Sequence, residues 1–382
     1  MNLDYEALRL LAWGLLVLAL IAYSICEGIN LGTLLLLPLI ADSDKERQLI
    51  LASISPTAQG QQAWLIAVMA ILFAAWPMAF AISLACLIWP FSILMLAWLL
   101  RPIGLVFRDA ANLTWRQHCD KGLAISGGLS IFVLGLIAGN LIKGIPFHLD
   151  NDMRIFFLGN VGELLNPFAL LVAAVSMALI LCHAALFLQL NPHTSFYANC
   201  KSITYKAGLS FIVLFILTGL WVSRLEGYHI SSEILTNASS NPLAKFVKRG
   251  EGLWLDNYEH QFSLWIIPSL AVLASALSLW FCKLEKNYWA FLASSVAMTM
   301  SVFTTAFTLF PFIIPSNRSL NTSLTLWDAS ASQANLSLLV PILLIGLPIM
   351  ALLSRGAFRL PNHLSLSPPK PPSTSCSSLK LD

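Results

Sequence analysis

The sequence predicts an all-α, polytopic membrane protein with about nine transmembrane helices. Of its 382 residues, 57% are apolar and only 11% are charged, and the mean hydropathy is +0.76, whereas soluble domains are about 25% charged. Its apolar runs of roughly 18–28 residues are separated by polar segments, and each is long enough to cross a hydrocarbon core about 30 Å thick as a helix.

The expected spans follow one another along the chain and are separated by polar segments. They lie at 8–37, 60–76, 79–100, 122–142, 165–189, 204–223, 262–282, 288–310 and 335–354. The second and third are joined by Trp76-Pro77-Met78, where the proline ends one helix and the next begins. The first six residues are acidic rather than basic and the following run is too long for a signal peptide, so we expect this span to be retained.

Lysine and arginine positions predict the orientation. Fourteen of the 22 fall in loops that follow odd-numbered spans, so the positive-inside rule places the N-terminus outside and the C-terminus in the cytoplasm. Three longer outer stretches, at 143–164, 224–261 and 311–334, are rich in aromatic and turn residues, and we expect them to be ordered. Residues 1–356 form the predicted transmembrane domain, and the Pro/Ser-rich segment 357–382 a disordered cytoplasmic tail.

The chain lacks the usual signatures of catalysis and cofactor binding. Its seven cysteines form no C-x-x-C pair, and it has no phosphate-binding loop and no nucleophile elbow. His183 is the one histidine well inside a span, whereas a haem with two histidine ligands needs two. It is expected to be a hydrogen-bonded core or interfacial histidine, with a Met or Glu partner left open. The net charge of +3, without basic runs interleaved with aromatics, argues against nucleic-acid binding. We therefore expect no catalytic residue and no metal site.

Glu27 is a carboxylate inside the first apolar span. A charge at this depth costs roughly 2.5–3.5 kcal/mol, so it marks a functional site by default. Asn30 lies one turn further along the same helix face, and Gln59 and Arg101, at the start of the second span and the end of the third, belong to the same cytoplasmic half. These four residues predict a proton entrance or an ion-stabilised site, or else interhelical packing with a snorkelling arginine.

Small residues surround that carboxylate. Gly28 and Gly32 form a small-x-x-x-small pair, which permits another helix to approach closely.

Several segments resemble subunit II of cytochrome bd-type quinol oxidases. The segment Glu27-Gly28-x-Asn30-x-Gly32 is similar to the family's D-G-F-D-x-G. Further matching segments follow in the family's order, and the resemblance covers about residues 1–356. They are Ser55–Leu65 (family A-P-x-W-D-G-N-x-x-W-L), Phe73–Pro77 (F-A-A-[FW]-P), Arg101–Gly104 (R-P-x-x), Leu164–Phe168, Ser240–Leu243, Phe310–Phe312 and Ser323–Ala329 (N-A-S-L-T-x-x-[DN]-A).

The resemblance implies a non-haem subunit of two four-helix bundles plus one extra helix in the bacterial cytoplasmic (inner) membrane. Its partner would be the haem-bearing subunit I, which holds haems b558, b595 and d and oxidises quinol, while the complex reduces O2 to water with cytoplasmic protons. No cofactor is expected on this chain alone. A structural quinone and small single-helix accessory subunits stay open, and the surrounding partner is membrane lipid.

The chain departs from the family at its expected proton path. Glu27 keeps a carboxylate where the family has its first Asp, but Asn30 and Gln59 replace two further Asp residues. Amides order water but do not release protons near pH 7. Glu27 is therefore the proton-transfer candidate, and Asn30, Gln59 and Arg101 are pathway or subunit-interface candidates. The alternative function is a proton-coupled secondary transporter, with Glu27 as the coupling carboxylate at a broken helix.

Overall fold

The computed structural model describes residues 4–54, 58–110 and 112–354. The predicted tail at 357–382 and the start of the motif at 55–57 lie outside the described residues, as do the side chains of residues 58–62.

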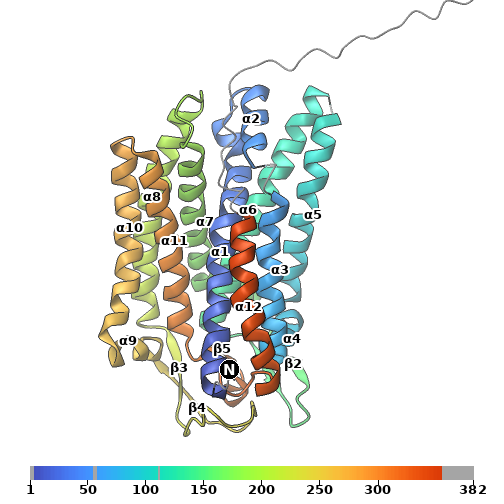
Figure 1. The fold of residues 1–382 in the computed structure, drawn as a ribbon, viewed down its shortest axis with the longest axis vertical. Coiled ribbons are helices and arrows are strands. Elements are labelled where there is room, and N and C mark those ends of the chain that lie inside the picture. The colour runs from blue at the N-terminus through green and yellow to red at the C-terminus, as the bar shows by residue number, and fades with distance from the viewer. Residues whose placement is uncertain (1–3, 55–57, 111, 355–382) are drawn as a thin grey trace, which may run out of the picture.

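Long apolar helices dominate the described part of the chain and run roughly parallel to one axis (Figure 1). Eight of them are long and apolar enough to cross a membrane. They are α1 (Tyr5–Ile40), α5 (Ile88–Ala110), α6 (Leu113–Lys143), α7 (Pro167–Leu188), α8 (Tyr197–Val222), α10 (Ile266–Lys283), α11 (Asn287–Leu309) and α12 (Gln333–Ser354). The pair α3 (Ala58–Ala75) and α4 (Pro77–Cys86), which meet at a bend of 119°, makes a ninth candidate when it is counted as one span. The prediction of an all-α, polytopic protein is confirmed.

The predicted third span, 79–100, is wrong at both ends. Pro77 starts the short helix α4, which is too short to cross the core and contacts strand β2 (Ile155–Phe157) at the end of the molecule. The true crossing, α5, begins at Ile88 and continues to Ala110. Hydropathy could not separate α4 from α5 because both helices are apolar. It also ended the span before Arg101, because a hydropathy value counts Arg101 as a free charge although its side chain is paired with a carboxylate.

The helices form two groups of four that meet along α1 and α6. Helices α1, α3, α5 and α6 make one group, and α7, α8, α10 and α11 make the other (Figure 1). Helix α1 contacts α6, α7 and α11 as well as α3, and α12 packs against α1 and α3. This arrangement agrees with the expected pair of four-helix bundles and one extra helix.

The long loops that contain the strands lie at the end of the helix bundle where α1 begins. Each loop holds one two-stranded antiparallel sheet: β1 (Phe147–Leu149) with β2, β3 (Glu226–Ile230) with β4 (Val247–Glu251), and β5 (Phe312–Ile314) with β6 (Leu324–Thr325). The short helix α9 (Asp256–His260) and four 3-10 turns complete this end; the turns are Val161–Leu165, Leu253–Leu255, Phe262–Trp265 and Leu320–Thr322. The expectation that these stretches are ordered is confirmed.

The opposite end carries α2 (Asp44–Ile54), a short polar helix that the hydropathy pattern did not predict (Figure 1). The side chain of Glu46, in the first turn of α2, accepts hydrogen bonds from the backbone N–H groups of Asp42 and Ser43, which precede the helix. These bonds fix the start of α2. Its apolar residues Ile50 and Ile54 are buried against α1 and the neighbouring helices. The helix therefore lies on the bundle rather than crossing it.

Candidate functional site

Glu27 forms a buried ion pair with Arg101. The distance from Arg101 Nη2 to Glu27 Oε1 is 2.6 Å, and the two side chains are 3% and 2% exposed. Asn30 Nδ2 donates to the other carboxylate oxygen of Glu27 over 3.1 Å. Three of the four predicted site residues are thus brought together, two from α1 and one from α5.

Arg101 reaches Glu27 because it lies inside α5, not at its end. The helix continues for nine residues beyond it, to Ala110, so its side chain projects sideways towards α1. Gln59, the fourth predicted residue, has its backbone in the first turn of α3, but its side chain is outside the described residues.

Unsatisfied polar atoms surround the ion pair. Within the described residues, Nε and Nη1 of Arg101, Oδ1 of Asn30 and the hydroxyl of Tyr23 are buried without a hydrogen-bond partner. Tyr23, Glu27 and Asn30 are spaced i, i+4 and i+7 and share one face of α1. Buried polar atoms in native proteins are nearly always paired with protein groups or ordered water, so this region is chemically suited to hold water beside a carboxylate.

A second charged cluster lies two helical turns further along α5 and was not predicted. Arg108 Nε contacts Asp120 Oδ1 at 2.5 Å, and both side chains are 2% exposed. Arg108 also pairs with Asp44 at 2.7 Å, and Arg116 and Arg47 complete the cluster by binding Asp44 and Asp120. The spacing of Arg101 and Arg108, seven residues on one apolar helix, was the signal that could have indicated a charged face.

The glycines beside Glu27 serve close packing, as their spacing predicted. A Cβ atom on Gly32 would lie 2.5 Å from the Cβ atom of Ala184 and 2.8 Å from the backbone oxygen of Ile180, both on α7. At Gly28 the nearest atom would be the terminal methyl of Met298 on α11, at 3.3 Å. These two positions let α1 pack tightly against the second helix group.

His183 is a packed core residue. Its side chain is fully buried, its Nδ1 lies 2.8 Å from the hydroxyl of Ser294, and its ring stacks on Phe291 at 4.8 Å. The expectation of a hydrogen-bonded core histidine is confirmed. Within the part of the chain that is described, no three His, Cys, Asp or Glu side chains are grouped as metal ligands.

The outer end holds a third charged pair. Lys245 Nζ lies 2.9 Å from Asp328 Oδ2, and the side chains are 7% and 13% exposed. Burial raises the pKa of the Asp328 carboxyl and lowers the pKa of the Lys245 ammonium group. Thr325 donates its backbone N–H to Asp328 Oδ1 over 3.0 Å, so the carboxylate also orders the turn after β6. The motifs around both residues were noted in the sequence, but their pairing was not predicted.

Comparison with known families decides which protein class has this architecture. The family model for "Cytochrome bd terminal oxidase subunit II" matches residues 8–360. The chain belongs to this family. The resemblance drawn from the sequence motifs is therefore confirmed, and with it the transmembrane, quinol-oxidase subunit class.

Relatives match over almost their whole length. The chain is 34% identical to the cytochrome bd-I ubiquinol oxidase subunit 2 of Escherichia coli (strain K12) over 352 residues, which is 92% of this chain and 93% of that protein. It is also 34% identical to a probable cytochrome oxidase subunit 2 of Haemophilus influenzae, over 88% of this chain and 90% of that one.

A solved structure shows the same fold. One chain of the bd oxidase from Geobacillus thermodenitrificans superposes with a TM-score of 0.66 at 13% sequence identity, and the match covers 94% of this chain and 99% of that one. This bd oxidase subunit II accordingly shares its helical architecture with a much diverged sequence.

Proposed function

We propose that this chain pairs with a haem-bearing subunit I in a membrane complex that oxidises quinol and reduces O2 to water. The observation that carries the proposal is the family match over residues 8–360, supported by 34% identity to a protein named as a bd-I ubiquinol oxidase subunit. This chain would complete the complex in the membrane and carry no redox centre of its own.

The residues of the described chain do not fit a haem. His183 is the one buried histidine among them, and its ring is held between Ser294 and Phe291 within the packed core. A second axial ligand would have to displace that packing. Electron transfer is accordingly assigned to the partner, where the resemblance places the three haems.

Glu27 is proposed to take part in proton delivery from the cytoplasm. The carboxylate is the one group of the Glu27–Asn30–Arg101 set whose chemistry allows it to take up and release a proton. Arg101 and Asn30 fix its position, and the surrounding unpaired polar atoms suit ordered water.

The orientation is proposed from the charge distribution. The end with α2 carries Asp44, Arg47 and the cluster around Arg108, and the opposite end carries the three sheets. We place the α2 end in the cytoplasm, following the positive-inside rule.

One purification tests the complex and its cofactors. The complex purified from membranes through a tag on this chain should contain a second large subunit and show a haem absorption spectrum, whereas this chain expressed alone should be colourless. Haem bound stoichiometrically to the isolated chain, or a colourless complex, would contradict the proposal.

Two new cysteines test the orientation. Asp152→Cys lies in the exposed β1–β2 turn and Lys45→Cys lies on α2. In a background with Cys119 and Cys376 replaced by serine, a membrane-impermeant thiol reagent should label the first in intact cells and the second only after lysis. The reverse pattern would invert the proposed topology.

The transporter alternative gains no support from the helices. Transporters of the kind considered use two broken helices in corresponding halves, and among the described helices a single pair, α3 and α4, has a sharp break. Glu27 lies on the unbroken helix α1, away from that bend.

A further inference from the structure

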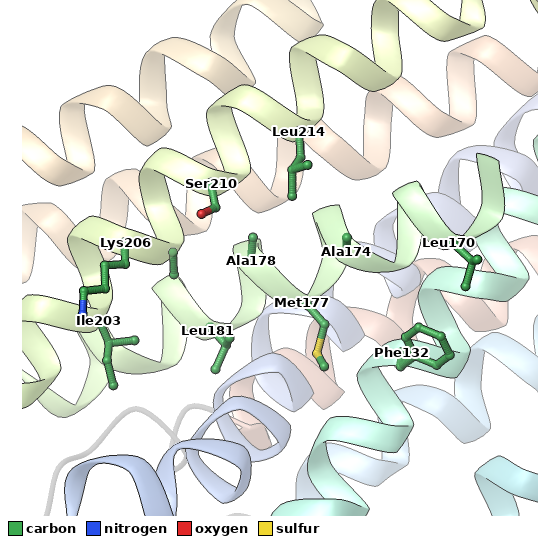
Figure 2. Close-up of a pocket in the computed structure, with 11 residues that line it drawn as sticks. Phe132, Leu170, Ala174, Met177, Ala178, Leu181, Ile203, Lys206, Ser210 and Leu214 are labelled. Atoms are coloured by element: carbon green, nitrogen blue, oxygen red, sulfur yellow. The ribbon is translucent and has the colours of Figure 1, made fainter. Parts of the chain in front are cut away.

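An open groove of about 490 Å³ runs along α7 between α6 and α8 (Figure 2). Ala174 and Ala178, spaced i and i+4 on α7, form its floor. Their side chains are small and leave open the space that larger residues would fill. Phe132 and Leu170 line one end, and Lys206 lies at the other (Figure 2). The groove is therefore apolar along its length with a cation at one end.

Lys206 is the one charged residue in the lining. Lys201, earlier on α8, is neutralised by Glu285 at 3.1 Å, but no carboxylate among the described residues forms an ion pair with Lys206. Tryptophan is typical of membrane interfaces, so Trp221, near the end of α8, marks the outer boundary of the membrane. Lys206 precedes Trp221 by 15 residues, or about 22 Å of helix. In a core about 30 Å thick, Lys206 thus lies where a cation is unfavourable unless it snorkels or meets an anion.

The groove is long enough for much of one acyl chain. From Leu170 to Leu181, both in the lining, α7 advances by eleven residues, or about 16 Å. Leu170 lies near the start of α7, at the end of the molecule that carries the sheets, whereas Leu181 lies nearer the α2 end. A lipid whose headgroup reached Lys206 from the α2 side would therefore lay one acyl chain along the groove, with its tail pointing towards Leu170.

We propose that this groove binds one anionic phospholipid. One acyl chain lies along α7 over Ala174 and Ala178, and the phosphate pairs with the ammonium group of Lys206. Ser210, one turn further on α8 and also in the lining, is placed to donate a hydrogen bond to an ester or phosphate oxygen. A zwitterionic lipid offers the same chain but carries a cation beside its phosphate, so the charge of Lys206 favours the anionic class. The site is separate from Glu27 and independent of the redox role proposed above.

Native mass spectrometry of the complex purified in mild detergent tests this site. When the two lipids are added at increasing concentration, dioleoyl phosphatidylglycerol should form a one-lipid adduct at a much lower concentration than phosphatidylcholine does. Lys206→Gln should weaken the phosphatidylglycerol adduct about tenfold, and Ala174→Leu, which fills the floor but keeps the charge, should also reduce it. Lys283→Gln, the same change at an exposed lysine of α10, should bind like the wild type.

Four outcomes would overturn the proposal. They are equal binding of the two lipids, an unchanged adduct in Lys206→Gln, recovery of a quinone instead of a phospholipid from the groove, and loss of the partner subunit in Lys206→Gln. The last would show that the groove is a protein interface. Because Lys206 is exposed at the rim, this variant tests the site even if Ala174→Leu fails to fold.

Discussion

Glu27 on α1 and Arg101 on α5 form an ion pair of 2.6 Å in which neither side chain is more than 3% exposed. Helix α5 makes most of its helix contacts with α6, so this pair adds a direct polar link between α5 and α1. Two charges removed from water in this way stabilise a protein only as a pair, and losing one partner leaves the other buried and uncompensated.

Removing either charge alone should therefore destabilise the protein more than removing both. We expect Glu27→Gln and Arg101→Gln each to lower the free energy of unfolding by about 3–5 kcal/mol, whereas the double variant should lose clearly less than the sum. Thermal unfolding of the purified complex measures all four proteins of this cycle. Additive losses would show that the two side chains do not interact.

The same cycle separates structure from proton transfer. If Glu27 carries protons, the double variant should regain assembly and haem content but stay slow in quinol oxidation, because neither glutamine can exchange a proton. Arg101→Lys keeps the cation and serves as the matched control. A double variant that turns over like the wild type at every pH would limit Glu27 to a packing role.

Close packing at Gly32 gives a second prediction. Gly32→Ala should cost about 1–3 kcal/mol of stability, as overpacking does, because its new methyl group would meet Ala184 and the backbone of Ile180. Gly14 is the matched control on the same helix, since nothing lies within 4 Å of a Cβ atom there. Gly14→Ala should be neutral or stabilising by up to about 1 kcal/mol. Equal effects on the unfolding temperature would contradict the close approach of α1 and α7.

Sequence patterns predicted most of this fold because a membrane restricts the alternatives. Eight of the nine crossings lie close to their expected positions, since an apolar run must cross as a helix. The third failed because hydropathy measures composition and registers neither the turn at Pro77 nor the paired charges that let α5 continue past Arg101.

The site was predicted less completely than the fold. Glu27 and Asn30 lie on one helix, so their spacing alone showed that they are neighbours. The pairings Glu27–Arg101 and Arg108–Asp120 join different helices, and one sequence does not record which helix faces which. A lone intramembrane charge predicts that it has a partner, but the identity of that partner required the structure.

The Arg108 cluster predicts a further stability effect. Asp120→Asn should lower the free energy of unfolding by about 3 kcal/mol, the low end for a broken buried pair, because Asp44 still contacts Arg108. Asp152→Asn is the control, since Asp152 and its partner Arg154 are each 70% exposed, and it should change stability by less than about 0.5 kcal/mol. Similar unfolding temperatures for the two variants would show that the cluster is not a stabilising element.

The outer pair Lys245–Asp328 predicts a pH effect of definite sign. Burial raises the pKa of Asp328 above its ordinary value of 3.8, so the folded protein binds this proton more readily than the unfolded chain does. Stability contributed by such a group is lost as pH rises through the folded pKa and regained as pH falls. Lys245→Met removes the nearest cation, although Arg9 on α1 still attracts the carboxylate, and should raise the pKa of Asp328 further.

Lys245→Met should consequently be destabilised at pH 7 and recover part of that loss when the pH is lowered to 5. The double variant Lys245→Met/Asp328→Asn has no carboxylate to protonate, so the same change of pH should give it no comparable recovery. Unfolding temperatures of the wild type and the two variants, measured at several pH values in one buffer series, decide the matter. Parallel profiles for the single and double variants would show that Asp328 does not titrate in this range, because every other ionisable group is common to both proteins.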